Sequence, residues 1–321
     1  MSFRHCVPQS CSVRWVFAGV TILFISSHAS GHAMQHSPFP SEQSAKHDRK
    51  FWLDISKNNY AVPEGEPVFP LLRELSAYLA SPDPQLRDDL AYSILYVWIV
   101  ARPRLTDPEL LSLLDDWQSN LRLGIGESNT DTVLRRSFSA LCLAAIAERD
   151  LRSPFLGELR YRALLDSALN YLHDERDLRG FDPVKGWIHS TAHTADLLAS
   201  LAANPLLKVE DQPRVLHAVA ERLSSAHQIF SYGEQDRLAF TIASIVARKD
   251  FDATAFRTWL SALDETDRQV WKSSPPEANR LKTFENNSYL LQALAARLNV
   301  QPQPLAIETA LGQVTQILRK R

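Results

Sequence analysis

From Phe51 onward, apolar residues recur every three or four positions, the spacing that places them on one face of an α-helix. Helix-start signals interrupt this pattern at short intervals. In Thr106-Asp107-Pro108-Glu109, for example, we expect Asp107 to cap a helix and Pro108 to occupy its first position. The chain has no alternating run long enough for a sheet and no Asn-Gly or Asp-Gly hairpin signal. The pattern therefore predicts an all-α fold.

The spacing of the start signals predicts how the helices are arranged. One set of starts falls near residues 84, 130, 187, 233 and 276, and a second set lies between them, near 67, 107, 154, 210, 252 and 304. Two helices in every 40–47 residues or so is the period of HEAT and armadillo arrays. We therefore expect a single helical-repeat domain over residues 51–321. The fold class that we predict is a right-handed α-solenoid of antiparallel helix pairs, with a closed α/α ring as the alternative.

The first 33 residues have the order of a secretory signal peptide. Two arginines and no acidic residue precede an uncharged run from Trp15 to Ser27, and small residues follow it. We expect cleavage after Ala33, a flexible lead-in over residues 34–50, and no membrane span in the mature chain. An uncleaved anchor is the alternative, although the apolar run is shorter than the ~20 residues of a spanning helix. The protein is therefore expected to be exported, either periplasmic or secreted.

Composition narrows the functional classes. The 321-residue chain carries 35 Lys and Arg against 37 Asp and Glu, which excludes a strongly basic nucleic-acid-binding protein. Its 10 glycines are few, which favours helices joined by short turns. Only Cys142 follows the predicted cleavage site, so the mature chain can form no internal disulfide. We expect Cys142 to be a buried, inert thiol.

The densest cluster of chemically active residue types lies in and just after an insertion at residues 174–186. If a helix follows it directly, His189, His193 and Asp196 fall on one stripe, within about 60° of one another. Two imidazoles at this spacing can bind a divalent transition metal, with Asp196 as a further ligand, or a His–Asp pair can transfer protons. No Glu follows His189, so the general base of the HExxH metalloproteases is missing. We predict no other cofactor.

A third interpretation of this stripe is a structural polar helix face. Pairing of Asp196 with Arg237 or Lys185 would indicate it. Equivalent helices of a solenoid line the same face, which is often concave and binds ligands. Polar residues on the helix that starts near 233, together with the end of the insertion, are therefore candidates for ligand binding. They are Lys185, Trp187, Glu234, Asp236 and Arg237.

The insertion itself allows two roles. Its sequence around Gly180 and Pro183 is typical of turns, so it could fold over the polar stripe as a lid. Alternatively, the rings of Phe181 and Trp187 could fill a gap between repeat units, which is the role that we favour for them.

Two segments of the chain resemble the uncharacterised bacterial family called domain of unknown function 2785. They are GFDPVKGWIHSTAHTADLL (Gly180–Leu198) and SYGEQDRLAF (Ser231–Phe240), and the similarity extends over roughly residues 51–298. The resemblance implies a helical, HEAT-like fold and brings no established activity. The family motif positions in this chain are Lys185, Gly186, Trp187, His189, His193, Asp196, Glu234, Asp236 and Arg237.

The leading hypothesis is an exported helical-repeat protein that binds a partner, peptide or glycan on a polar concave face, with no nucleic-acid partner. The alternative is a hydrolase that uses His189, His193 and Asp196 as metal ligands or as acid and base groups.

Overall fold

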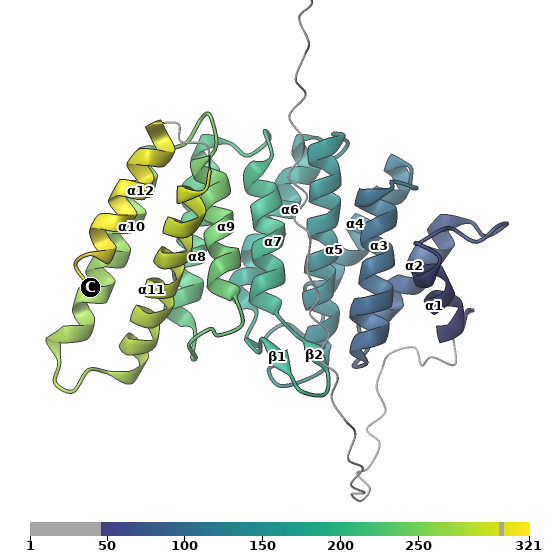
Figure 1. Cartoon of the computed structure of the whole chain (residues 1–321), viewed down its shortest axis with the longest axis horizontal. Helices are drawn as coiled ribbons and strands as arrows, with labels where there is room; N and C mark the ends of the chain where they lie inside the picture. Colours follow the sequence, from purple (N-terminus) through teal and green to yellow (C-terminus); the bar gives the residue numbers. More distant parts are fainter. Residues whose placement is uncertain (1–45, 302–304) are drawn as a thin grey trace, which may run out of the picture. The chain divides into compact units, whose positions relative to one another are not determined.

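The computed structural model describes residues 46–301 and 305–321, and they are mostly helical, as the sequence predicts (Figure 1). The predicted signal peptide and its cleavage site lie outside the described residues. The α-helices are α1 (Arg49–Lys57), α2 (Val68–Tyr78), α3 (Ser93–Tyr96), α4 (Asp107–Asn120), α5 (Thr132–Arg152), α6 (Gly157–Asp174), α7 (Ser190–Ala203), α8 (Gln212–Ser225), α9 (Glu234–Val246), α10 (Ala253–Gln269), α11 (Ala278–Asn299) and α12 (Leu305–Leu318). Two π-helical segments, Gln85–Tyr92 and Val97–Ala101, extend α3 in both directions.

Most helices begin close to their predicted start signals. α5, α9 and α11 begin at Thr132, Glu234 and Ala278, against predicted starts near 130, 233 and 276. Asp252 caps α10, because its Oδ1 accepts hydrogen bonds from the backbone N–H groups two and three residues later, at 3.0 and 2.9 Å. α1 begins at Arg49, inside the lead-in that the sequence predicted to be flexible.

The cap of α4 differs from the prediction. Thr106 caps this helix, and Glu109 Oε2 accepts hydrogen bonds from both the backbone N and the Oγ1 of Thr106, each at 2.8 Å. Glu109 is the third helical residue, so the contact of its side chain with the backbone N–H of Thr106 belongs to a capping box. Asp107 is instead the first helical residue, where its negative charge faces the positive end of the helix dipole.

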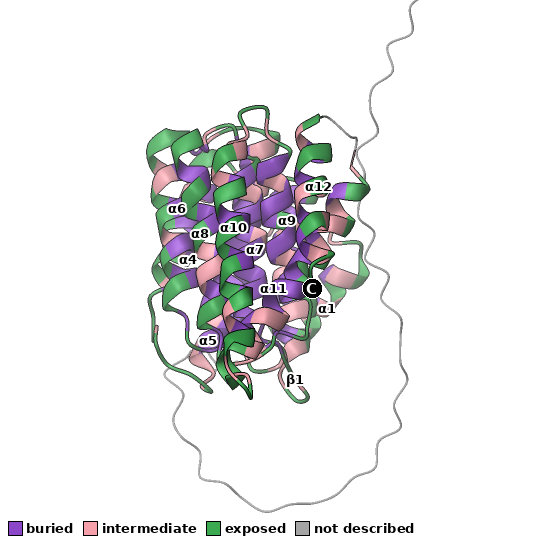
Figure 2. Ribbon diagram, turned by 90° about the vertical axis from the view of Figure 1, so that its left-hand side faces the viewer, coloured by how far each residue is buried: buried purple, intermediate pink, exposed green. Residues whose placement is uncertain are grey.

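Long helices pack side by side in chain order. α5 packs against α7, α7 against α9, and α9 against α11, so that they form one row (Figure 1). The helices α4, α6, α8 and α10 pack on this row, and buried residues fill the space between them (Figure 2). Cys142 lies in this core as a free thiol, as predicted, and burial raises its pKa. None of the helices described here is long and apolar enough to cross a membrane.

α7 is an interior helix. From Ser190 to Ala202, only Asp196 and Ser200 retain partial exposure. Its sequence is rich in Ala, Ser and Thr, and these small side chains let α5 and α9 approach closely on either side. The polar residues of α7 are therefore mostly core residues.

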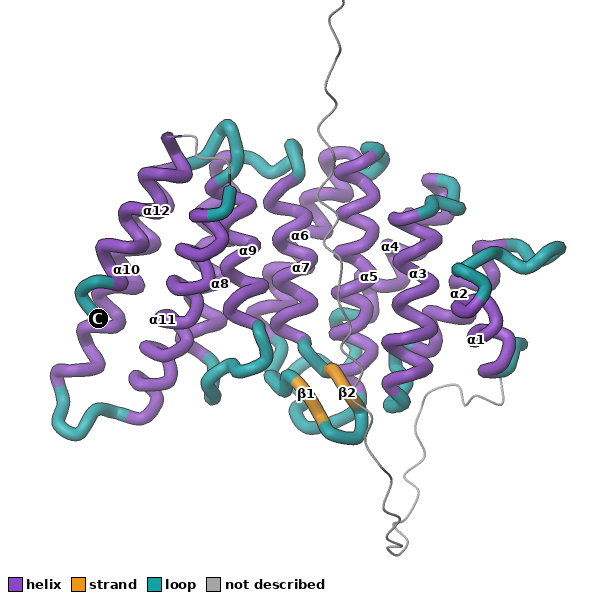
Figure 3. Tube along the Cα trace, viewed as in Figure 1, coloured by secondary structure: helices purple, strands orange, loops and turns teal. Residues whose placement is uncertain are grey.

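The insertion before α7 contains a short hairpin (Figure 3). β1 (Phe181–Asp182) pairs with β2 (Gly186–Trp187) in antiparallel fashion, and Phe181 lies opposite Trp187. Asp182 Oδ1 accepts hydrogen bonds from the next N–H groups in the turn, those of Val184 and Lys185, both at 2.8 Å. The predicted helix start near residue 187 is therefore wrong, because the chain is still in the hairpin there and α7 begins at Ser190.

Candidate functional site

His189 occupies the turn between the hairpin and α7. Its backbone lies in the left-handed region, with φ at 51°, and the residue is only 5% exposed. The ring Nε2 lies 3.0 Å from the carbonyl oxygen of Tyr232. Since a carbonyl oxygen can only accept, Nε2 carries the hydrogen. Burial, assisted by the charge of Arg237, lowers the pKa of His189 to about 4, so the ring is neutral at pH 7.

His193 lies one turn further along α7, against α5. Its Nδ1 is 2.8 Å from Ser137 Oγ, and the same hydroxyl donates a hydrogen bond to the carbonyl oxygen of Ile188. Because a hydroxyl has a single hydrogen, Ser137 must accept from His193 Nδ1–H. A histidine that activates a serine nucleophile would instead accept the hydroxyl proton. Burial also holds the pKa of His193 well below its usual value, so this ring too is neutral.

Asp196 forms an ion pair with Arg237 of α9. Both side chains are partly exposed. Burial raises the pKa of Asp196 to about 6, although the charge of Arg237 acts in the opposite direction. Lys185, the other partner that the sequence offered for Asp196, pairs with Asp131 instead. The Asp196–Arg237 contact links α7 to α9 and supports the structural interpretation of this carboxylate.

The structure brings His189 and His193 close together but does not group Asp196 with them as a third metal ligand. The two imidazole rings lie at 84° to each other with centroids 5.8 Å apart, and Asp196 is held by Arg237. In the part of the chain that the structure describes, no group of three or more His, Cys, Asp or Glu side chains is placed to hold a metal ion. Helical geometry placed His189 on the stripe, but this residue precedes the helix and has a left-handed backbone.

Glu234 and Asp236, the acidic candidates on α9, have different surroundings. Glu234 is buried, and its Oε2 accepts a hydrogen bond of 2.9 Å from the backbone N of Tyr232. Its Oε1 lies 3.8 Å from His189 Nε2, and burial raises the pKa of Glu234. Asp236 is on the outside of α9, where its Oδ1 accepts a hydrogen bond of 2.9 Å from Arg297 Nε. Glu234 therefore shapes the loop before α9, whereas Asp236 bridges to α11.

Three aromatic side chains form an exposed cluster above this polar interior. Phe181, Trp187 and Tyr232 are 41%, 42% and 47% exposed. The Phe181 and Trp187 ring centroids are 4.9 Å apart, and each is 6.3 Å from that of Tyr232. We call these three residues the hairpin aromatic surface. The prediction that Phe181 and Trp187 fill a gap between repeat units is wrong, because both rings face solvent.

The hairpin aromatic surface is supported by a buried arginine and by a close contact of the backbone with one of its rings. The Arg87 guanidinium, fully buried, donates through Nη2 to the carbonyl oxygens of Lys185 and Trp187 at 2.6 and 3.0 Å. On the opposite side, the chain passes so close to Tyr232 that a methyl group at Gly180 would lie 2.8 Å from Tyr232 Cγ. The hairpin is therefore fastened to the helix that contains α3 and to the loop before α9.

Tyr232 is not among the residues predicted from the sequence to form the site. It lies in SYGEQDRLAF, one of the two segments that carry the family resemblance, between the equally overlooked Ser231 and Gly233. The glycine that follows Tyr232 was a usable sequence signal, because a glycine just before a helix indicates a tight loop, and Gly233 has φ at 91° in the structure.

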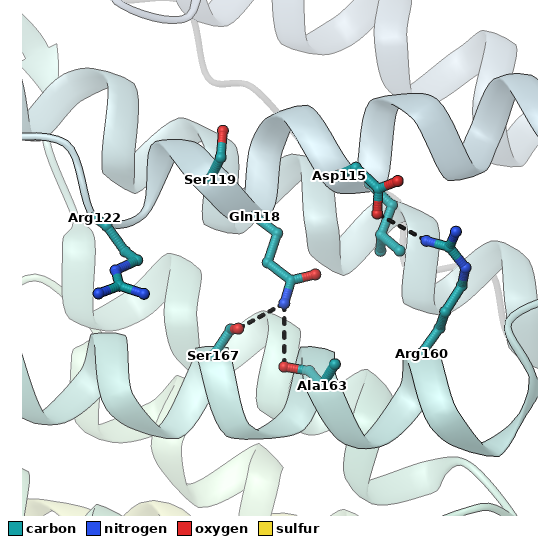
Figure 4. Close-up of a pocket in the computed structure, with 8 residues that line it drawn as sticks. Asp115, Gln118, Ser119, Arg122, Arg160, Ala163 and Ser167 are labelled. Carbon is teal, nitrogen blue, oxygen red and sulfur yellow. Dashed lines mark hydrogen bonds and ion pairs between the residues drawn. The ribbon is translucent and has the colours of Figure 1, made fainter.

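A separate groove of about 450 Å³ lies between α4 and α6 (Figure 4). Gln118 Nε2 donates to Ser167 Oγ at 2.6 Å, and Arg160 Nη1 donates to Asp115 Oδ1 at 2.7 Å across it. These polar side chains bind one another across the seam between the two helices. None of the residues selected from the sequence lines this groove.

A family model described as "Protein of unknown function (DUF2785)" matches residues 121–296, which is more than half of the chain. The match includes the whole hairpin aromatic surface, α5, α7 and α9. It begins well after residue 51, where the similarity was expected to start. No curated protein and no solved structure gives a significant match to the chain.

Proposed function

The chain belongs to the DUF2785 family of proteins of unknown function, so we infer its role from its own geometry: we propose that it is an exported helical-repeat protein that binds a partner, peptide or glycan through the hairpin aromatic surface. The observation that carries this proposal is the mutual contact of three rings that are each more than 40% exposed. Clustered exposed aromatic groups are a common feature of recognition surfaces, because they bury much area on binding.

The support beneath the rings strengthens this proposal. Trp187 stacks on His189, and the backbone of Trp187 is held by the buried Arg87. Side chains that are already fixed lose little conformational entropy when a ligand arrives, which lowers the cost of binding. The polar residues that the sequence singled out thus act mainly as a frame for the rings.

The hydrogen bonds of these polar residues give little support to a hydrolase. His193 donates its Nδ1 hydrogen to Ser137, His189 donates its Nε2 hydrogen to Tyr232, and Asp196 pairs with Arg237. A metal bound here is tested by elemental analysis of the purified mature protein and of the His189→Ala and His193→Ala variants. The binding proposal predicts no stoichiometric metal that both variants lose. One equivalent of Zn, Mn or Fe lost in both would favour the hydrolase.

We propose in addition that the helices form a right-handed α-solenoid of antiparallel pairs, of the HEAT or armadillo kind. The packing of α5, α7, α9 and α11 in chain order, with α4, α6, α8 and α10 on the other side, supports this arrangement. Such a repeat array would present the hairpin, an insertion in one repeat, at the edge where its loops emerge.

Export rests on the amino-terminal sequence. We propose that residues 1–33 direct the chain across a membrane and are removed, so that the mature protein is periplasmic or secreted. Expression of the full chain, fractionation of the cells and intact-mass measurement test this step. The expected product begins at Met34, whereas a full-length chain that stays in the cytoplasm would contradict it.

Binding is tested with oligosaccharide and peptide libraries, using wild-type protein and two variants. Trp187→Leu removes the central ring of the surface and keeps an apolar side chain. Tyr289→Ala is the matched control, because Tyr289 is also 47% exposed but lies on α11. We expect at least one ligand whose affinity falls roughly tenfold or more in Trp187→Leu, as for an aromatic hot spot, and stays unchanged in Tyr289→Ala. Ligands that bind equally to all three proteins would contradict the proposal.

A further inference from the structure

In the hairpin aromatic surface, the Trp187 ring stands steeply to the other two rings, which are tilted by only 38° to each other. The plane of Trp187 makes an angle of 80° with that of Tyr232 and 69° with that of Phe181. In the corner between the Trp187 and Tyr232 rings, whose centroids lie 6.3 Å apart, a cation could come within the ~6 Å range of a cation–π contact with both. The second face of Trp187 is covered by His189.

A buried carboxylate lies beside this corner. Glu234 Oε1 would lie 2.7 Å from a methyl group at Gly180, the same methyl group that the Tyr232 ring crowds, so the buried carboxylate lies beside that ring. The cations nearest the hairpin already have carboxylate partners: Lys185 pairs with Asp131, and Arg237 pairs with Asp196. Burial raises the pKa of Glu234, and the charge of Arg237 acts on it in the opposite direction.

The neighbouring histidine adds no positive charge. His189 is neutral at pH 7, because burial lowers its pKa to about 4. The corner therefore combines aromatic faces with a buried carboxylate beside them, and this is a combination that attracts an organic cation.

Resting on the proposed function, we infer that the corner between Trp187 and Tyr232 binds a trimethylammonium group, such as that of choline. The ring angles favour a compact, rounded cation, because such a group can contact rings of different orientation at once, whereas a pyranose ring stacks on a single flat face. A trimethylammonium group also loses less hydration than a primary ammonium, so the apolar rings can surround it.

The inference is tested with choline and its uncharged carbon analogue, 3,3-dimethyl-1-butanol. The reporter is the indole N–H resonance of Trp187, assigned by its loss in Trp187→Leu. Choline should shift this resonance saturably and bind at least about fivefold more tightly than the neutral analogue, since the two differ in charge and hardly in shape. Equal affinity for the two compounds, or no shift with choline, would overturn the inference.

Variants of Tyr232 separate the ring from the hydroxyl. Tyr232→Phe keeps a ring face and should bind choline within about threefold of wild type, whereas Tyr232→Leu should bind at least about fivefold more weakly. Tyr289→Ala should be unchanged. Circular dichroism confirms that each variant is folded. A Tyr232→Leu protein that is folded and binds choline normally would exclude the corner as the site.

Two further experiments identify the source of the trimethylammonium group and distinguish the cation inference from the proposed binding function. Sedimentation with phosphatidylcholine vesicles, compared with phosphatidylglycerol vesicles, would assign the group to a lipid headgroup; binding of free choline without vesicle binding would assign it to a small solute. If choline fails but a library glycan or peptide shifts the Trp187 resonance, the cation inference is wrong and the binding function stands. If no compound of any class shifts it, both are wrong.

Discussion

Trp187 lies flat on His189, with ring centroids 4.4 Å apart and ring planes at 23°. This stack joins an exposed ring of the hairpin to a buried imidazole at the start of α7. It explains why the motif contains both residues: the histidine fixes the orientation of the tryptophan, and the tryptophan covers the histidine. The site is therefore an aromatic surface supported by neutral, hydrogen-bonded polar groups.

The backbone at His189 leads to the first prediction. At φ 51°, asparagine is tolerated much better than alanine, because its short polar side chain stabilises the left-handed conformation. Both substitutions remove the stack on Trp187 and the hydrogen bond to Tyr232. We expect His189→Ala to lower the free energy of unfolding by about 2–4 kcal/mol, and His189→Asn by about 1 kcal/mol less.

Urea denaturation measures these differences. His173→Ala is the control, because His173 lies on the outside of α6 with half of its side chain exposed, and it should change the stability by less than about 0.5 kcal/mol. An asparagine variant that is less stable than the alanine variant would show that the left-handed backbone is not what limits this position.

A second prediction concerns pH. In the unfolded chain His189 titrates near its ordinary pKa of about 6.5, and in the folded protein near about 4. Between these values the unfolded state binds more protons, so the contribution of His189 to stability is complete above pH 6.5 and is lost as the pH falls through 4. The loss approaches about 3 kcal/mol, at 1.36 kcal/mol for each pKa unit.

Other groups also titrate in this range, so a difference measurement is needed. The pKa of Asp196 is raised to about 6, so this residue acts in the opposite sense: its contribution to the stability of the folded protein falls as the pH rises. Comparing wild type with His189→Asn from pH 7 to pH 4.5 cancels these common contributions. Wild type should lose more stability on acidification than the variant. Parallel curves would contradict the depressed pKa of His189.

The ion pair between α7 and α9 gives a third prediction. Arg237 opposes the effect of burial on Asp196, so replacing it with methionine should raise the pKa of Asp196 above about 6. The carboxyl carbon resonance of Asp196, followed by NMR during a pH titration, measures the shift. A pKa that stays the same or falls in Arg237→Met would mean that the guanidinium does not stabilise this carboxylate in solution.

Gly180 gives a fourth prediction, which rests on the steric clash that a side chain would make there and not on backbone strain. A methyl group there would lie 2.7 Å from Glu234 Oε1 and 2.8 Å from Tyr232 Cγ, so Gly180→Ala must displace Tyr232. We expect a loss of about 1–3 kcal/mol of stability and a shifted Trp187 indole resonance. In the control, Gly312→Ala, the methyl group meets no atom within 4 Å inside α12, and better helix propensity should stabilise the chain by about 0.5–1 kcal/mol. Equal effects at both glycines would contradict this account.

The positions of the helices were predictable because their causes are local. Asp252 caps α10 and Thr106 caps α4 through hydrogen bonds within a few residues, and such signals are visible in the sequence. The spacing of these signals then gave the order of the helices. The family resemblance likewise depended on two short segments, and the family match confirms it.

The environment of the polar residues was not predictable from local patterns. A stripe of His193 and Asp196 on α7 looks the same in the sequence whether it faces solvent or a neighbouring helix, and the packing of α5 and α9 on both sides decides this. The left-handed turn at His189 has no sequence signal, because it is imposed by hydrogen bonds from its N–H to Arg179 and Gly180. The exposed cluster with Tyr232 likewise depends on contacts between segments distant in the chain.

If the hairpin aromatic surface binds the ligand of this protein, the loss of one of its rings must weaken binding. The decisive measurement is the affinity of wild type, Trp187→Leu and Tyr289→Ala for one ligand selected from the libraries by the wild-type protein. We expect a loss of about tenfold or more in Trp187→Leu, with no change in Tyr289→Ala. A ligand that binds all three folded proteins with the same affinity would contradict it.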